Sequence, residues 1–238
     1  MAAEVLQATG NSRCPEPTEK REPAMAKSLL TESDKRAIAE VIQKAETSTS
    51  GEIVFSLTDA AAKYRHATLQ AALAGMVIGA ATYLALPLNH SISLLLWIEL
   101  ISFAGFYAMF SKLAWRRWFV SSAEMDARVR DAAFTEFYAS GLYRTRDSNG
   151  VLILLSCFEK RVVVLGDKGI HQKLGDHHWD EVRDLIIEGI RSGKAREGIC
   201  AAVDSCGKAL AQHFPRSHDD VNELSDSVID RRMRPDAP

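Results

Sequence analysis

Two long apolar runs in the middle of the chain dominate its hydrophobic pattern. Residues 69–86 carry no charge, and residues 91–110 carry only Glu99. At about 1.5 Å per residue, each run is close to the ~30 Å thickness of a bilayer core. The alternative is a pair of buried helices in a soluble protein, but a domain of this size would struggle to cover two helices that are apolar all round. We therefore predict a transmembrane helical hairpin within residues 67–113.

The charges around the two runs predict their orientation. The connector, residues 87–90, is short, so the spans are antiparallel and both flanks share one compartment. The connector has no Lys or Arg, whereas basic residues stand on both flanks: Lys63, Arg65, Lys112, Arg116 and Arg117. Because such residues concentrate on the cytoplasmic side of a membrane, we expect both termini in the cytoplasm. The expected location is a bacterial inner membrane.

Two features inside the apolar runs suggest helix packing and a special role. Gly75 and Gly79 form a GxxxG pattern, which lets two helix backbones approach closely; the partner is either the second run or another copy of the chain. Glu99 lies about 15 Å deep by its distance from the connector. It is either a proton relay or a contact to another subunit, or else a protonated carboxyl group bonded to Thr82, Ser102 or a backbone carbonyl.

Outside the apolar runs, helical periodicity alternates with strand-like runs. Thr31 and Asp34 are spaced as in a capping box, which predicts a helix start, and Gly141 is typical of a helix end. The predicted elements are, in order, helix, strand, helix, strand, strand, helix and helix, over residues 31–47, 52–57, 121–140, 151–156, 162–165, 178–191 and 195–213. This order predicts the α/β class, a sheet covered by helices with its strand pairing undetermined.

Composition excludes some classes of function. Charged residues make up 25% of the 238 residues and the net charge is -2, which does not fit a strongly basic nucleic-acid binder. The cysteines are Cys14, Cys157, Cys200 and Cys206, and no two have the C-x-x-C spacing of a metal site. We predict buried thiols in a reducing compartment, and no nucleic-acid partner.

The two ends of the chain are polar. Residues 1–24 lack the continuous apolar core of a signal peptide and are predicted to form a disordered tail, and Met25 is a second candidate start. Residues 214–238 form a C-terminal tail. Within it, we expect residues 219–229 to dock on the domain through their apolar side chains, and residues 231–235 to be solvated. These side chains are Val221, Leu224, Val228 and Ile229.

Several short motifs resemble the TPM domain, a family named for a thylakoid lumen protein, a photosystem II accessory protein and a nematode receptor-associated protein. The resemblance covers about residues 30–213, with the hairpin inserted between a first part, 25–59, and a second part, 119–213. The motifs are Thr49-Ser50-Gly51-Glu52-Ile53, Gly141-Leu142 with Thr145, Asn149-Gly150-Val151-Leu152-Ile153-Leu154, the run from Arg161 to Ile170 that contains Gly166-Asp167-Lys168-Gly169, and Asp176.

The resemblance implies a fold and several activities. It implies an α/β sandwich, often membrane-tethered, and linked in some members to photosystem repair, acid phosphatase activity and calcium. In many relatives the domain follows a signal peptide and lies outside the cytoplasm, which differs from the orientation predicted here. Four motif glycines stand at strand ends, where positive φ or close backbone approach favours glycine: Gly51, Gly150, Gly166 and Gly169.

Signatures of phosphatase chemistry are absent from the sequence. No Cys-x5-Arg loop, Asp-x-Asp or Gly-x-Ser-x-Gly motif occurs, and Ser192-Gly193-Lys194 is followed by Ala195 where a P-loop needs Ser or Thr. The best metal candidates are Asp167, Asp176 and His177, which would suit calcium or another divalent cation. The alternative is that Asp176 caps a helix that begins near Trp179.

These observations favour one function and leave a second open. The first is an integral membrane protein that presents a TPM-like domain as a noncatalytic interaction or assembly module. Its expected partners are the lipid bilayer, an unidentified membrane protein and, as a homo-oligomer, its own copies. The second is a metal-dependent, acid-phosphatase-like hydrolase, which rests on the family resemblance alone.

Overall fold

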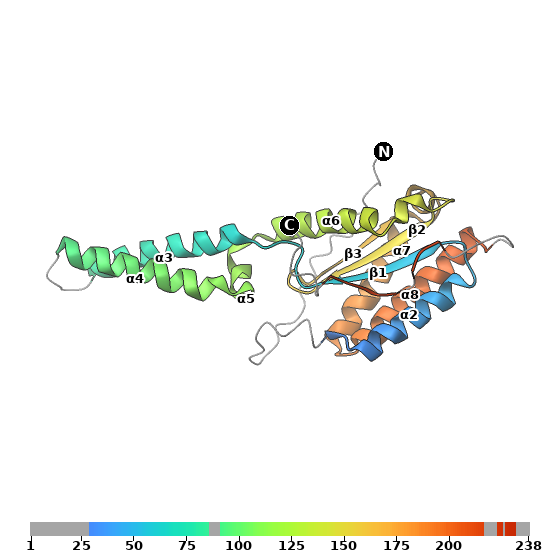
Figure 1. Ribbon diagram of the computed structural model, residues 1–238, viewed down its shortest axis with the longest axis horizontal. Helices are drawn as coiled ribbons and strands as arrows, with labels where there is room; N and C mark the ends of the chain where they lie inside the picture. Colours follow the sequence, from blue (N-terminus) through green and yellow to red (C-terminus); the bar gives the residue numbers. More distant parts are fainter. Residues whose placement is uncertain (1–28, 86–90, 217–222, 226, 232–238) are drawn as a thin grey trace. The chain divides into compact units, whose positions relative to one another are not determined.

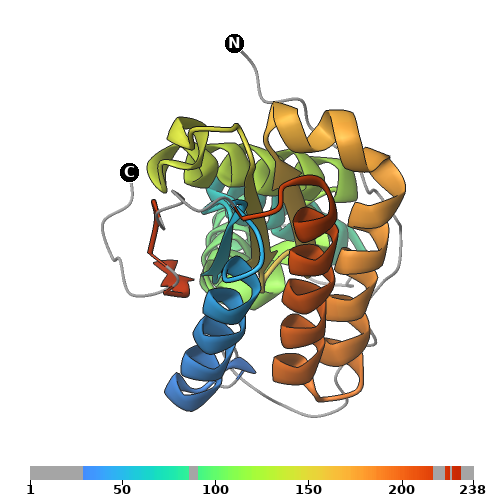
Figure 2. The same ribbon diagram turned by 90° about the vertical axis from the view of Figure 1, so that its right-hand side faces the viewer.

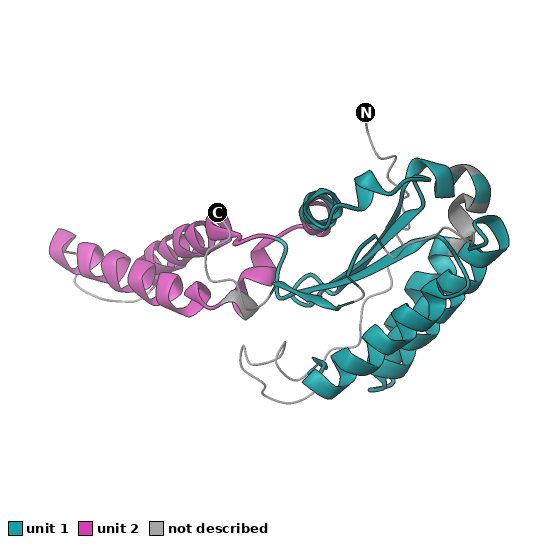
Figure 3. Ribbon diagram, turned by 45° about the vertical axis from the view of Figure 1, so that its right-hand side comes forward, with its two compact units in different colours: residues 1–61, 126–238 teal, residues 62–125 magenta. Residues whose placement is uncertain are grey.

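The computed structural model describes residues 29–85, 91–216, 223–225 and 227–231. The chain divides into two compact units, which Figure 3 shows in different colours. We call the first the sheet domain; it combines residues 1–61 with residues 126–238. We call the second, residues 62–125, the hairpin unit. The predicted N-terminal tail, residues 1–24, lies outside the described residues.

A mixed sheet forms the centre of the sheet domain (Figure 1). The described strands lie in the order β3–β2–β1–β4. β1 (Glu52–Thr58) is parallel to β2 (Gly150–Ser156), and β2 is antiparallel to β3 (Arg161–Gly166), which follows it after a short turn. β4 (Ile229–Asp230), which the sequence pattern did not predict, is parallel to β1. β1 and β2 are apolar along most of their length because helices cover both faces of the sheet.

Three helices cover one face of this sheet. They are α2 (Glu32–Glu46), α7 (Lys168–Arg191) and α8 (Ala195–His213), and α8 packs against both of the others (Figure 2). The helices and alternate strand positions together enclose the larger core. Its fully or almost fully buried members include Ile38, Ile53, Phe55, Val151, Ile153, Trp179, Ile186 and Ile199.

Among the described residues, α6 (Ser122–Ala139) covers the opposite face. The second core lies here, between α6 and the other set of strand positions, and includes Val54, Val129, Ala133, Phe137, Leu152 and Leu154. Gly141 follows α6 with a positive φ of 82°, the left-handed conformation typical of the residue after a helix. The predicted α/β class is therefore confirmed, in the form of helix, sheet and helix layers.

The predicted start of the helix before Arg191 was wrong. α7 begins at Lys168, ten positions before the predicted start at residue 178, and Asp167 is its N-cap. The prediction followed apolar periodicity, which begins clearly only with Trp179 and Val182. The first turn of α7 buries Ile170 alone among its apolar residues with described side chains. Asp176 lies inside α7, so it does not cap a helix near Trp179.

The hairpin unit consists of two long helices and a short helical connection. α3 (Arg65–Ala85) and α4 (Ile92–Ser111) match the two apolar runs, and α5 (Leu113–Arg116) and η1 (Arg117–Phe119) follow. Both long helices have the length and composition of a membrane span.

Close contacts hold α3 and α4 together. A Cβ atom on Gly75 would lie 2.5 Å from the Phe106 ring, and one on Gly79 would lie 2.6 Å from the Ser102 hydroxyl oxygen. The two glycines of the GxxxG pattern therefore face α4 of the same hairpin. Near the start of α3, the Thr68 hydroxyl donates a hydrogen bond of 3.1 Å to the backbone carbonyl of Phe110.

Candidate functional site

Several of the motif residues that carry the family resemblance meet where β1 and β2 begin. Glu52, the first residue of β1, is paired with Gly150, the first residue of β2. The Gly150 carbonyl accepts a hydrogen bond of 2.9 Å from the backbone N–H of Asp167, which follows β3. The starts of β1 and β2 and the end of β3 therefore lie together. We call this region the motif edge: residues 49–53, 149–150 and 166–169.

Side chains of the motif edge bond the backbone of neighbouring segments. The Thr49 hydroxyl donates to the Phe214 carbonyl at 2.6 Å and accepts from the Gly51 N–H at 3.0 Å. The Asn149 amide donates to the Ser50 carbonyl at 2.6 Å. Thr49 and Asn149 are almost fully buried. Because their polar groups fix the backbone, these residues stabilise the junction of β1, β2 and the end of α8.

None of the four motif glycines has a positive φ. Their positions are therefore explained by the close approach of neighbouring atoms to the glycine backbone. A Cβ atom on Gly169 would lie 2.7 Å from the Ser148 carbonyl oxygen, and one on Gly150 would lie 2.7 Å from a methyl carbon of Leu142. A Cβ atom on Gly51 or Gly166 would lie 3.0 or 3.2 Å from its nearest neighbour. Glycine is required at Gly169, where backbone atoms leave no room for a Cβ atom; at Gly51, Gly150 and Gly166 the nearest atoms belong to the side chains of neighbouring segments.

Asp167 has a structural role in the arrangement described. Its carboxylate accepts a hydrogen bond of 2.6 Å from the backbone N–H of Lys168, so it caps α7 at the positive end of the helix. The side chains of the other predicted ligands, Asp176 and His177, lie outside those that the structure describes. Among the described side chains, no group of three or more His, Cys, Asp or Glu residues could hold a metal ion.

The cysteines on α8 are poor nucleophiles. Cys206 is fully buried, and burial raises the pKa of its thiol to about 12. Burial also raises the pKa of Cys200. Because the thiolate is the reactive form of cysteine, neither residue is activated for attack on a phosphoryl group.

A second polar cluster lies at the opposite end of these strands, where β1 and β2 finish. Glu159 is fully buried between β2 and β3. One carboxyl oxygen accepts a hydrogen bond of 3.0 Å from the backbone N–H of Ala61, and the other bonds the hydroxyl of Ser156, which is also fully buried. Ala61 is the last residue of the sheet domain before the hairpin unit. We call Ala61, Ser156 and Glu159 the exit cluster, because it fixes the chain where it leaves the domain.

The hairpin unit exposes an unusual amount of apolar surface. None of the most apolar 18-residue window of α4 is buried, against 39% of the corresponding window in α3. Exposed side chains of the two helices include Leu69, Leu73, Val77, Ile78, Leu84, Ile92, Leu96, Trp97, Leu100, Ile101 and Tyr107. Glu99 interrupts this surface. Its Oε2 atom is buried and has no hydrogen-bond partner among the described residues, so the alternative of a carboxyl group bonded to Thr82, Ser102 or a backbone carbonyl is not found for that atom.

A polar segment near the C-terminus lies along the side of β1 that does not pair with β2. We call residues 223–225 and 227–231 the strap. Its backbone N–H at Glu223 donates to the Glu52 carboxylate at 3.0 Å, and the Glu223 carboxylate accepts from the Arg146 N–H at 3.3 Å. Ile229 and Asp230 form β4, so the docking expected for this segment is present in its described part; Val221 lies outside it.

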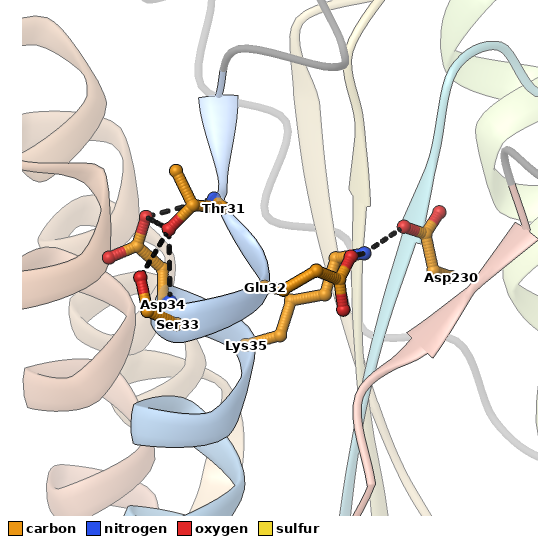
Figure 4. A network of polar contacts seen from close by, with 6 residues as sticks. All are labelled: Thr31, Glu32, Ser33, Asp34, Lys35 and Asp230. Atoms are coloured by element: carbon orange, nitrogen blue, oxygen red, sulfur yellow. Dashed lines mark hydrogen bonds and ion pairs between the residues drawn. The ribbon is translucent and has the colours of Figure 1, made fainter.

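Two ion pairs hold the strap to helices on both faces of the sheet. Asp230 accepts from Lys35 of α2 at 2.6 Å (Figure 4), and Arg231 binds both carboxyl oxygens of Glu136 on α6 at 2.7 and 2.8 Å. Burial would lower the pKa of Lys35, but its pairing with Asp230 and Glu32 outweighs this and raises the pKa. The hydrogen bonds that the Arg231 guanidinium group donates to Glu136 raise the pKa of Arg231. The prediction that Arg231 is solvated was therefore wrong.

The geometry defines a layered α/β domain with a structural motif edge and an inserted apolar hairpin. Residues 118–209 match the family model of the TPM domain, which confirms the resemblance carried by the motifs after the hairpin. The fold is similar to that of the BA42 protein from the psychrophilic bacterium Bizionia argentinensis, solved by NMR, with a TM-score of 0.53 and 23% identity over 84% of this chain and 94% of that one. No curated protein matches the chain.

Proposed function

We propose that the chain is an integral membrane protein that presents its TPM-like domain to another membrane protein as a noncatalytic interaction module. The observation that carries the membrane part is α4, whose apolar window is entirely unburied. Folded soluble proteins rarely expose a contiguous apolar surface of more than a few hundred Å². A core helix of a soluble domain would be covered by its own chain, whereas lipid covers this helix without a protein partner.

The dimensions and flanks of the hairpin support a bilayer-spanning position. α3 and α4 have 21 and 20 residues, which at about 1.5 Å each reach across a ~30 Å hydrocarbon core. Arg116 lies at the base, where its guanidinium group donates to the carbonyls of Lys63, Phe110 and Ser111. A cation there satisfies the carbonyls that end α4 and suits the cytoplasmic interface.

The proposed orientation places both termini in the cytoplasm of a bacterial cell, at the inner membrane. The basic residues that support it, Lys63, Arg65 and Lys112, are exposed in the hairpin unit. The sheet domain on both sides of the hairpin then lies in the cytoplasm, consistent with the thiols of Cys200 and Cys206 on α8.

The noncatalytic part rests on how the motif residues are used. Thr49, Asn149 and Asp167 bond the backbone, and the thiols of Cys200 and Cys206 are held in the protonated form. These groups support the fold of the motif edge and leave no activated nucleophile among them. We infer that the domain acts by binding a partner, and a divalent cation, if it binds at the start of α7, would act there as a structural ligand.

Alkaline carbonate extraction of cell membranes tests the membrane part. The chain should stay in the membrane pellet and dissolve only in detergent; recovery in the carbonate supernatant would overturn the proposal. For orientation, Asn89→Cys in a background without native cysteines should react with an impermeant maleimide from outside intact cells. Asp204→Cys, at an exposed position of α8, is the matched control and should react only after lysis. Crosslinking in native membranes, followed by mass spectrometry, should then identify a recurrent membrane-protein partner.

A further inference from the structure

Among the described residues, only part of the β1 edge that faces the strap is paired with another strand. β1 has seven residues, but β4 pairs with two of them, Ser56 and Leu57. Strand edges present backbone donors and acceptors to any extended segment that reaches them. The strap therefore pairs with this edge through a very short strand, and the specificity of its binding comes mostly from side-chain contacts.

The side chains of Lys35 and Glu136 form a binding site for one negative and one positive group. Lys35 on α2 and Glu136 on α6 are largely buried, with relative exposures of 9% and 7%, and they approach consecutive strap residues from the two faces of the sheet. A segment that lies beside β1 therefore needs a carboxylate toward α2 and a guanidinium group toward α6. The sequence Ile229-Asp230-Arg231 supplies both, after an apolar residue that packs on the α6 core.

The strap itself is held lightly. Its described residues are all exposed or only partly buried, and its packing comes from Leu224, Val228 and Ile229, each at the margin of a core. Segments with few buried apolar contacts open at a small cost in free energy compared with the whole domain. The receptor groups Lys35 and Glu136, in contrast, belong to α2 and α6, whose packing in the two cores comes mainly from residues outside the strap.

We propose that the β1 edge, together with Lys35 and Glu136, is a docking site for an extended peptide segment of a partner protein with an apolar–acidic–basic sequence, which the chain's own strap occupies. The inference deepens the proposed interaction role and rests on it. A partner segment would add a parallel strand beside β1, a known mode of peptide recognition in which the backbone gives affinity and side chains give specificity. The strap then competes with the partner inside the same chain.

The test uses the detergent-solubilised chain and a fluorescent peptide with the sequence of residues 223–231. A chain truncated after Arg216 should bind this peptide about tenfold or more tightly than the full-length chain, because its site is open. A peptide with Lys at the Asp230 position and Glu at the Arg231 position should bind the truncated chain about tenfold more weakly. The variant Lys35→Glu/Glu136→Arg of the truncated chain should reverse this preference.

Two controls keep each outcome decisive. Circular dichroism checks that the truncated chain folds; if it does not, the full-length variant Arg231→Glu, which weakens the strap from within, should gain peptide binding instead. Equal binding of the two peptides, or equal binding to open and strapped chains, would overturn the proposal. A full-length dimer that the truncation abolishes would assign the site to a second copy and also overturn it. Peptide binding in detergent does not depend on membrane insertion, so its failure is separate from a failure in carbonate extraction.

Discussion

Removing the carboxyl group of Glu159 should weaken the sheet domain severely. The side chain is fully buried and accepts bonds from the Ala61 N–H and the Ser156 hydroxyl. In Glu159→Ala both donors lose their acceptor inside the protein, at about 1–3 kcal/mol each, and the deleted atoms leave a void. We expect a loss of about 3–5 kcal/mol in the free energy of unfolding, a large part of the 5–15 kcal/mol typical of a domain.

Two further variants separate the lost bonds from the lost volume. Glu159→Gln keeps the size of the side chain and one acceptor oxygen, so it should cost only about 1–2 kcal/mol. Asp204→Ala removes an acid whose ion pair with Lys208 is exposed, and it should change stability by about 0.5 kcal/mol or less.

Urea unfolding of the full-length chain in detergent provides the measurement. Trp179 is buried in the larger core and reports on the sheet domain by fluorescence. Hydrogen exchange at the Ala61 amide provides a local readout and should accelerate in Glu159→Ala beyond the change expected from global stability. A loss below about 1 kcal/mol in Glu159→Ala, or equal losses for Ala and Gln, would refute the role given to the two hydrogen bonds.

Three other predictions follow from the packing of Gly75, from the capping box that Thr31 and Asp34 form at the start of α2 (Figure 4), and from the burial of Cys206. In the hairpin unit, Gly75→Ala should lower thermal stability in detergent because its Cβ meets the facing ring, whereas Gly105→Ala, with nothing within 4 Å, should not; equal melting temperatures would count against the packing described. Thr31→Ala should cost about 1 kcal/mol near neutral pH, measured by urea unfolding. Hydrogen bonds from Thr31 lower the pKa of Asp34, so this part of the stability is present above the unfolded pKa and is lost as pH falls through the lower folded value; the cost of the substitution should shrink in acid, and a constant difference would contradict it. Cys206 should resist an aromatic disulfide reagent in the folded chain and react after unfolding in urea, and fast labelling of the folded chain would disprove its burial.

The elements that the sequence predicts well include those with a continuous apolar run. β1, β2 and β3 are apolar runs because both faces of the sheet are covered, and α3 and α4 are apolar on all sides. The start of α7 was missed because its first turns bury little, and the cap depends on the single carboxylate of Asp167.

The contacts of the candidate sites were less accessible from sequence, because they join positions far apart in the chain. Glu159 stands in a short polar turn and gives no sign that its partner is Ala61. Arg231 lies in a charged, Pro-containing tail, where solvation is the usual outcome, and its pairing with Glu136 depends on β4 reaching β1. The motif glycines were found by resemblance, but only the structure distinguishes close approach from positive φ.

The parallel pairing of β1 with β2 has a consequence for how the chain is made. Ala61 and Glu159 are 98 positions apart, so at roughly 5–20 residues per second the ribosome takes about 5–20 s to supply the carboxyl group that fixes the end of β1. During that time α2 and β1 have left the ribosome, but neither neighbour of β1 in the sheet exists. An apolar strand with two open edges is prone to wrong pairing. From the order of synthesis we therefore expect the N-terminal part of the sheet domain to depend on chaperones, or on rapid completion of the chain, more than its final stability would suggest.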